Sequence, residues 1–208
     1  GKGVALRLAS QGATVVVNYA GSEAAANEVV DTIKANGGEA FAYKCNVADY
    51  VAVEQMVADV VEKYGRVDIL VNNAALWRAW ASFAETPTEE WRKYIDINIM
   101  GVVYVTKAVL PGMTVRNYGR VINVASVAGV YGNANMVHYS ATKGAIISLT
   151  KALAKEVADK GVTVNAVSPG SVSPSENGDI DFFRPSELSF MGRTGTDREN
   201  AELICFLA

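Results

Sequence analysis

Short runs of β-branched and other apolar residues alternate along the chain with longer segments whose apolar residues recur at helical spacing. The short runs are predicted to be strands covered on both faces, and they span residues 13–19, 39–47, 67–74, 119–126 and 162–170. Helices are predicted between them, including one that Ser22 caps and a long one over residues 90–110. The alternation predicts one α/β domain, residues 1–208, built on a Rossmann-like, doubly wound parallel sheet.

Local signals refine these helices, and both ends of the chain depart from the alternation. Thr86 and Glu89, with Pro87 between them, have the spacing of a capping box before the long helix. Residues 1–17 are predicted to be a helix followed by a strand, whereas a doubly wound nucleotide-binding unit begins with a strand. A parallel sheet without its central strand would expose unpaired backbone groups. We therefore expect a first and a last strand outside these residues.

Composition argues against several classes of protein. The chain has 19 Lys and Arg against 22 Asp and Glu, a net charge of -3, without a dense basic run, so nucleic acid is not an expected partner. Cys45 and Cys205 lie far apart without CxxC or histidine spacing, so neither a disulfide framework nor a metal site is expected. Because no uninterrupted apolar run approaches the ~20 residues of a membrane span and no signal-peptide pattern opens the chain, we expect a cytoplasmic protein without membrane association.

Small and amide residues follow the carboxyl ends of the predicted strands, in NYAGS, CNVAD, NNAA, NVASVAG and VSPGS. Ligands of open α/β sheets bind beyond these ends, and small residues let a cofactor approach the backbone. Each motif by itself is equally typical of a turn. Their repetition at successive strand ends favours a binding site.

Tyr139 and Lys143 lie four residues apart in the helical segment HYSATKGAIISLTKAL, so their side chains share one face. A nearby ammonium favours phenolate and is expected to lower the pKa of Tyr139 from about 10 toward the working pH, which makes a usable general acid or base. The pair alone is also typical of a solvated helix face. Ser126, at the end of a predicted strand, favours the catalytic interpretation.

With these residues the sequence resembles the short-chain dehydrogenase/reductase family over essentially the whole chain. Gly1 resembles the last glycine of that family's TGxxxGxG turn, NNAA resembles its NNAG, and NAVSPG resembles its PG turn. Asn98, Ser126, Tyr139 and Lys143 match its Asn-Ser-Tyr-Lys active site. Within the family, GATVVVNYAGSEAAANEVV and MGRTGTDRENAELICFLA most resemble the 3-oxoacyl-[acyl-carrier-protein] reductases and relatives that act on ketones, secondary alcohols or sugars.

The resemblance implies a mechanism. A nicotinamide cofactor would deliver hydride to a carbonyl carbon while Tyr139 protonates the oxygen and Ser126 donates a second hydrogen bond to it. Lys143 would hold the nicotinamide ribose, and Asn98 would anchor a water that relays protons to Lys143. The alternative for Asn98 is a helix-interior amide that makes a local kink.

The resemblance also implies a set of cofactor-binding residues. NADP(H) is favoured because no carboxylate follows the strand that ends at Asn18 and Tyr19, although NAD(H) stays possible. Asn46 replaces a usual aspartate, and its amide oxygen still accepts a hydrogen bond from adenine. Ala75 and Pro174 depart from the family's glycine and threonine, with Ser173 a substitute for the threonine. The expected cofactor contacts are Gly1, Asn18, Asn46, Val47, Asn73, Ala74, Tyr139, Lys143, Pro169, Gly170 and Val172.

Three features bear on the substrate. Residues 171–191 mix turn formers with three phenylalanines, as expected of a flexible lid. Trp77, Trp80 and Met136 are expected to contact substrate, although packing on the scaffold is equally compatible with the tryptophans. His138, the only histidine, is interpreted as structural because Tyr139 already fills the acid/base role.

The sequence therefore predicts an NADP(H)-dependent oxidoreductase that reduces a 3-oxoacyl thioester or another ketone. The family further implies a homo-oligomer, tetramer or dimer, formed through the helix that carries Tyr139 and the long helix before it. One alternative is a sugar, polyol or secondary-alcohol dehydrogenase that runs in the oxidative direction. Another is a non-catalytic nucleotide-binding sensor or scaffold, against which the intact Asn-Ser-Tyr-Lys set argues.

Overall fold

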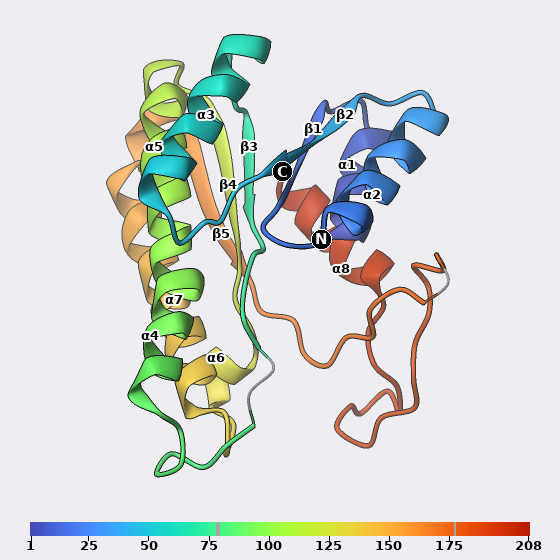
Figure 1. The fold of residues 1–208 in the computed structure, drawn as a ribbon, viewed down its shortest axis with the longest axis vertical. Helices are drawn as coiled ribbons and strands as arrows, with labels where there is room; N and C mark the ends of the chain where they lie inside the picture. The colour runs from blue at the N-terminus through green and yellow to red at the C-terminus, as the bar shows by residue number, and fades with distance from the viewer. Residues whose placement is uncertain (78–79, 177) are drawn as a thin grey trace. The chain divides into compact units, whose positions relative to one another are not determined.

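The computed structural model describes residues 1–77, 80–176 and 178–208. Strands and helices alternate as predicted, and each strand lies within one of the five apolar runs. All strand pairings are parallel, which confirms the α/β class (Figure 1). The strands are β1 (Val15–Tyr19), β2 (Ala40–Lys44), β3 (Ile69–Asn72), β4 (Gly119–Val124) and β5 (Val162–Val167).

The chain divides into two compact units. Unit 1 comprises Gly1–Asn46 and Pro169–Leu207. In it β1 pairs with β2 from Val15↔Ala40 to Tyr19↔Lys44. Apolar side chains of the first helix, the second helix and these strands form its core, including Ala5, Val29 and Ile33. Its helices are α1 (Lys2–Ser10), α2 (Glu23–Ala35) and α8 (Asp197–Leu207), and α8 packs against α1.

Unit 2 comprises Val47–Ser168 with Ala208. Its sheet has the order β3-β4-β5. Helix α5 packs against β3 and β4, while α7 packs against β5, and Val102, Ala125 and Ile146 form a buried cluster between them. The helices are α3 (Tyr50–Tyr64), α4 (Thr88–Ile95), α5 (Gly101–Val115), α6 (Ala128–Tyr131) and α7 (Val137–Glu156), with a 3-10 turn at Ala158–Lys160.

Backbone pairing forms two sheets, β1-β2 and β3-β4-β5. A doubly wound sheet in the order 3-2-1-4-5-6 is continuous only when its first strand pairs with both the second and the fourth. Within the described residues β1 and β3 each have one hydrogen-bonded neighbour. The organisation as a single domain stays a prediction.

The start of α4 differs from the expected capping box. The helix begins at Thr88 with Pro87 as its N-cap, and no side chain caps it. The hydroxyl of Thr86 instead donates to the Ser82 carbonyl at 2.8 Å. The prediction at Thr86 is therefore wrong, because this hydroxyl closes the preceding turn.

A π-helical turn, Asp96–Met100, joins α4 to α5, and the Gly101 amide donates across it to the Asp96 carbonyl. The helical stretch Thr88–Arg116 is thereby long and apolar enough to cross a membrane by length and composition, the one such stretch in the described ranges, although charges interrupt it. Its most apolar window is 39% buried. Core helices of globular proteins pass the same test.

Candidate active site

The hydroxyls of Ser126 and Tyr139 meet in unit 2. Ser126 follows the end of β4 by two residues, and its hydroxyl also accepts a hydrogen bond from the Ala128 amide at 3.1 Å. Tyr139 lies in the first turn of α7 and is half-buried, with its hydroxyl hydrogen-bonded to the Ser126 side chain. Two hydroxyl groups are therefore directed at one place, as a site that polarises a carbonyl oxygen requires.

The pKa of Tyr139 departs from the expected direction. Burial raises it above its usual value, the Ser126 hydrogen bond lowers it, and Tyr94 raises it further. The ammonium of Lys143 lies 5.8 Å from the centre of the Tyr139 ring and is hydrogen-bonded to the Val124 carbonyl at 2.5 Å. The predicted lowering by Lys143 is therefore wrong in this structure, because desolvation dominates. A neutral phenol at pH 7 suits a proton donor.

Lys143 is 4% exposed, and burial lowers its pKa to about 8. Helix α6 comes very close to α7 at this point. A Cβ atom placed on Gly129 would lie 2.5 Å from the carbonyl carbon of Lys143 and 2.9 Å from its Cβ. Glycine at residue 129 therefore lets α6 and α7 approach each other where the lysine is held.

Asn98 lies in the π-helical turn and is 1% exposed. Its Oδ1 accepts from the Leu76 amide at 2.7 Å, and its Nδ2 donates to the Leu76 carbonyl at 3.0 Å and to Thr142 Oγ1 at 3.1 Å. The helix has π-helical hydrogen bonding here, and such turns often occur at functional sites. The water-anchoring role of Asn98 stays a prediction.

A buried ladder of amides and hydroxyls lies beside the site. Asn72 Nδ2 donates to Asn123 Oδ1 at 2.9 Å and to Thr106 Oγ1 at 3.1 Å, while Asn123 Nδ2 donates to Thr150 Oγ1 at 2.9 Å. Sequence reasoning missed these residues and Thr142. Two asparagines inside otherwise apolar strands were the available signal, because a buried amide needs partners.

The expected cofactor contacts divide between the two units. In unit 2, Asn73 and Ala74 are exposed directly after β3. Val47 packs beside the π-helical turn, since a Cβ on Gly101 would lie 2.7 Å from Val47 Cγ2. The contacts in unit 1 are the exposed Gly1, Asn18, Asn46 and Gly170 and the half-buried Pro169 and Val172.

The end of β1 carries a feature that bears on cofactor choice. The Asn18 amide donates to the carbonyls of Tyr43 and Cys45, at 3.2 and 3.0 Å, and so ties β1 to the end of β2. Desolvation and the Glu23 carboxylate, which accepts a hydrogen bond from the Tyr19 phenol, raise the pKa of Tyr19. A carboxylate therefore does lie beside the end of this strand, contrary to the sequence interpretation.

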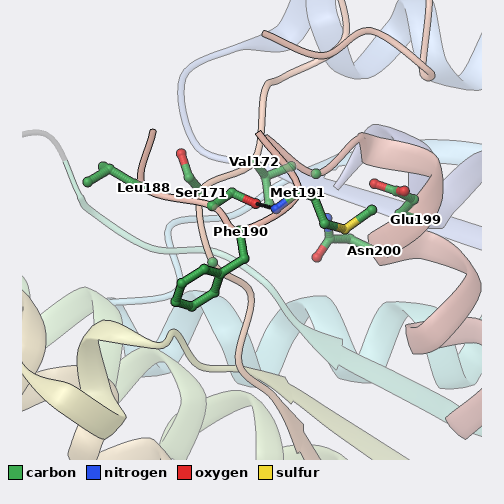
Figure 2. Close-up of a pocket in the computed structure, with 10 residues that line it drawn as sticks. Ser171, Val172, Leu188, Phe190, Met191, Glu199 and Asn200 are labelled. Carbon is green, nitrogen blue, oxygen red and sulfur yellow. Dashed lines mark hydrogen bonds between the residues drawn. The ribbon is translucent and has the colours of Figure 1, made fainter. Parts of the chain in front are cut away.

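Within unit 1, residues 170–172, the loop 188–191 and α8 line a pocket of about 470 Å³. Figure 2 shows Met191 of the loop in this pocket with Glu199 and Asn200 of α8. Leu188 and Phe190 are almost fully exposed. Ser173, the expected substitute for the family's threonine, is buried, and its hydroxyl is hydrogen-bonded to that of Thr194 at 2.7 Å.

The expected substrate contacts lie in unit 2 with different exposure. Trp77 and Trp80 are 55% and 66% exposed, whereas Met136, directly before α7, is buried. His138 is 1% exposed, its ring is 4.3 Å from that of Tyr94 between centres, and neither of its nitrogens has a hydrogen-bond partner among the described residues. This burial agrees with the structural interpretation of His138.

Parallel strands with small residues after their carboxyl ends, and a Ser-Tyr-Lys group just after β4 and on α7, define a dinucleotide-binding α/β oxidoreductase. A family model described as short chain dehydrogenase matches residues 1–181. The chain belongs to the short-chain dehydrogenase family, whose members are oxidoreductases that act on CH–OH groups with a nicotinamide cofactor.

Curated relatives and a solved structure agree with this assignment. A 3-oxoacyl-[acyl-carrier-protein] reductase of Synechocystis sp. is 43% identical over all of this chain and 84% of that protein. The enzyme FabG of the same description is 41% identical in Staphylococcus epidermidis and 37% identical in Thermotoga maritima, over 86% and 85% of those proteins. The crystal structure of an NAD+-bound xylitol dehydrogenase matches with a TM-score of 0.90 and 33% identity, over the whole chain and 86% of that structure.

Proposed function

We propose that this protein is an NADP(H)-dependent reductase of a 3-oxoacyl thioester or a related ketone. The observation that carries the proposal is the position of Ser126 after β4 and of Tyr139 on α7 with a buried Lys143, whose ammonium lies 5.8 Å from the centre of the Tyr139 ring. The curated relatives described as 3-oxoacyl-[acyl-carrier-protein] reductases support the substrate class.

The residues of unit 2 supply the proton chemistry of such a reduction. A nicotinamide nucleotide, when bound, supplies the hydride and its two electrons to the carbonyl carbon. Tyr139 donates its phenolic proton to the carbonyl oxygen, so C=O becomes CH–OH, and Ser126 donates a second hydrogen bond to the charge that develops there. Burial keeps the phenol protonated at neutral pH by raising its pKa. Lys143, with Asn98 nearby in the same unit, returns a proton to the phenolate.

The residues after β3 and β4 fit a nucleotide. Asn73, Ala74 and Ala75 follow β3 with only small or amide side chains, and Ala125 and Ser126 follow β4 in the same way. Backbone groups at these strand ends are therefore open to close approach. Asn73, Ala74 and Val47 in unit 2, with Lys143 on the ribose, would hold the nucleotide.

NADP(H) preference rests on Asn18 at the end of β1, where NAD-preferring folds place an acidic residue. The Glu23 carboxylate, which raises the pKa of Tyr19, lies near this strand end and counts against the preference. We expect kcat/KM to favour NADPH over NADH by about tenfold or more, an energy of ~1.4 kcal/mol. A higher kcat/KM with NADH in steady-state assays would reverse this assignment.

The decisive experiment follows NADPH oxidation by the purified full-length protein with acetoacetyl thioesters, aromatic ketones and sugars. Tyr139→Phe is expected to lower kcat at least ~100-fold by removing the proton donor. Tyr118→Phe is the matched control, since Tyr118 precedes β4 whereas Ser126 follows its other end. Thioester turnover that depends on Tyr139 supports the proposal, and turnover restricted to sugars rejects it.

A second candidate function is the oxidation of a polyol or other secondary alcohol. The match to an NAD+-bound xylitol dehydrogenase favours it. NAD+-dependent oxidation of polyols by the wild type, lost in Tyr139→Phe, would select this function. Nucleotide binding without turnover on any carbonyl or alcohol would instead select the non-catalytic sensor or scaffold.

We also propose a cytoplasmic homo-oligomer, tetramer or dimer. Helices α5 and α7 carry partly exposed apolar side chains, among them Val103, Leu110, Leu149 and Leu153, which suit helix pairing between copies. Light scattering after size exclusion tests it, and a monomer at micromolar concentration would exclude it.

A further inference from the structure

Thr142 lies on α7 between the proposed proton donor and the proposed lysine, and it is 1% exposed. Its hydroxyl donates to the Tyr139 carbonyl at 2.8 Å and accepts from Asn98 Nδ2 at 3.1 Å. A threonine hydroxyl has a single hydrogen to donate. Because that hydrogen goes to Tyr139, Thr142 presents only lone pairs toward Asn98.

This arrangement determines which way the Asn98 amide points. The NH2 end must face Thr142, since only a donor can bond to the remaining lone pairs. Independently, the oxygen end must face the Leu76 amide, because Asn98 Oδ1 accepts a hydrogen bond from it at 2.7 Å. Thr142 and Leu76 thus specify the same orientation from two sides, in a place where a wrongly turned amide would leave buried polar groups unpaired.

Leu76 and Tyr139, at the two ends of this chain of hydrogen bonds, belong to different parts of the proposed site. Leu76 follows Asn73 and Ala74, which are proposed to contact the nucleotide, while Tyr139 is the proposed proton donor. Hydrogen bonds therefore run from the loop after β3 through Asn98 and Thr142 to the backbone of Tyr139.

We propose that Thr142 is a positioning residue, which holds the Asn98 amide and thereby fixes the loop after β3 relative to Tyr139. The inference rests on the proposed function of this site. Hydride and proton transfer to one carbonyl tolerate little misplacement, and about 1 Å can cost ~100-fold in rate. Loss of the Thr142 hydroxyl should therefore lower kcat far more than it weakens nucleotide binding.

Thr150 provides a matched control on the same helix. It is 5% exposed, its hydroxyl donates to the Ile146 carbonyl at 2.8 Å, and it accepts from Asn123 Nδ2 at 2.9 Å. Like Thr142, Thr150 donates to a backbone carbonyl of its own helix and accepts from a buried asparagine, about two helical turns further along α7. Thr142→Val and Thr150→Val each remove one buried hydroxyl of this pattern, while Thr142→Ser retains it.

In the full-length protein, Thr142→Val is expected to lower kcat about 10- to 100-fold, with the KM for nucleotide changed less than about threefold. Thr142→Ser should restore kcat to within about threefold of wild type. Thr150→Val should lower the urea midpoint as much as Thr142→Val does while keeping kcat near wild type. Equal loss of kcat in both valine variants, or no rescue by serine, would overturn the proposal.

A measurement without turnover separates this proposal from the proposed function. Hydrogen exchange at the Leu76 amide, which donates to Asn98, should be about tenfold faster in Thr142→Val and unchanged in Thr150→Val. Absent turnover in wild type would reject the reductase, and the exchange rates would still decide the role of Thr142. Unchanged exchange in Thr142→Val would reject the positioning role.

Discussion

The proposed catalytic residues of unit 2 and the loop 171–196 of unit 1 are held by different kinds of interaction. In unit 2 the amides beside the site are buried and uncharged, with Asn98 and Asn123 at most 1% exposed and hydrogen-bonded to hydroxyls or backbone. Such bonds are costly to break, because a buried partner left unpaired loses ~1–3 kcal/mol. The geometry around Tyr139 and Lys143 is therefore strongly specified.

Charged pairs at the surface contribute to holding the loop, beside the buried hydrogen bond between the Ser173 and Thr194 hydroxyls. Arg193 bonds to Glu199 at 2.6 Å and Arg198 bonds to Asp181 at 2.6 Å, with every one of these side chains partly exposed. Pairs of this kind contribute ~1 kcal/mol or less and weaken with salt. The comparison indicates that the proposed catalytic residues are held by hydrogen bonds that cost more to break than the ion pairs of the loop.

Gly129→Ala is the change expected to damage the rigid region most. The added methyl would lie 2.5 Å from the Lys143 carbonyl carbon, so α6 and α7 must separate. Overpacking of this kind costs ~1–3 kcal/mol, and displacement of Lys143 should lower kcat about 100-fold. Urea unfolding and NADPH oxidation measure the two effects.

Gly112→Ala controls for the change of residue type. On α5 the new methyl would meet only the end of the flexible Arg116 side chain, at 3.3 Å, and alanine favours helix by up to ~1 kcal/mol. Wild-type kcat in Gly129→Ala would show that the close approach at Lys143 does not position the lysine.

The pH dependence of the free energy of unfolding measures what the burial of Lys143 costs the same region. Its pKa falls from 10.5 to about 8 because desolvation disfavours the charged form. Below pH 8 the folded protein must bury a charge, a penalty on the order of 3 kcal/mol that disappears as pH rises from 8 to 10.5. Wild-type stability should therefore rise through that window relative to Lys143→Met.

At pH 7 we expect Lys143→Met to be about 1–2 kcal/mol more stable than wild type, since relief of the charge exceeds the lost bond to Val124. Its activity should be lost. Urea titrations at pH 7 and 10 measure the difference, and a variant that is less stable at both would contradict the assignment of burial as the dominant cause.

Unit 2 shows which features of the fold and of the candidate site could be predicted from the sequence. Continuous apolar runs predict all five strands, and helical spacing places Tyr139 beside Lys143. The direction of the Tyr139 pKa depends on burial and on where the Lys143 ammonium points, neither of which spacing encodes. Thr142 and Asn123 were missed for a related reason, since their partners lie 44 and 51 residues away in the bonds to Asn98 and Asn72.

Glu199→Gln probes the weaker interactions of the loop. Two hydrogen bonds from Arg193 and one from the Thr196 amide lower the pKa of Glu199 to about 2. Glu199 therefore binds a proton less readily in the folded protein than in the unfolded one. Its ionised form contributes to folding stability above pH 4.5, and this contribution is lost as pH falls toward 2. Because Glu199 is half exposed, we expect at most ~1 kcal/mol of destabilisation at pH 7. The matched change is Glu202→Gln at the exposed pair with Arg7.

Limited proteolysis distinguishes loop opening from global unfolding in this variant. Cleavage within residues 171–191 should accelerate severalfold in Glu199→Gln and with added salt in wild type, while the urea midpoint moves little. Salt-independent cleavage in wild type would show that ion pairs do not hold the loop.

His138→Phe is expected to have the smallest effect. It tests whether a buried polar side chain of unit 2 that makes no hydrogen bond is needed for activity. The ring packs edge to face on Tyr94 and near Trp91, and neither nitrogen has a partner in the described part of the chain. Phenylalanine keeps the aromatic contact and removes two unsatisfied atoms, so stability should stay within ~1 kcal/mol or rise. His138→Ala, which opens a cavity, should cost ~2–4 kcal/mol. A loss of kcat in His138→Phe at unchanged stability would instead show that the imidazole takes part in the chemistry of Tyr139. His138 would then serve the proposed active site, as Asn98 and Thr142 are proposed to do.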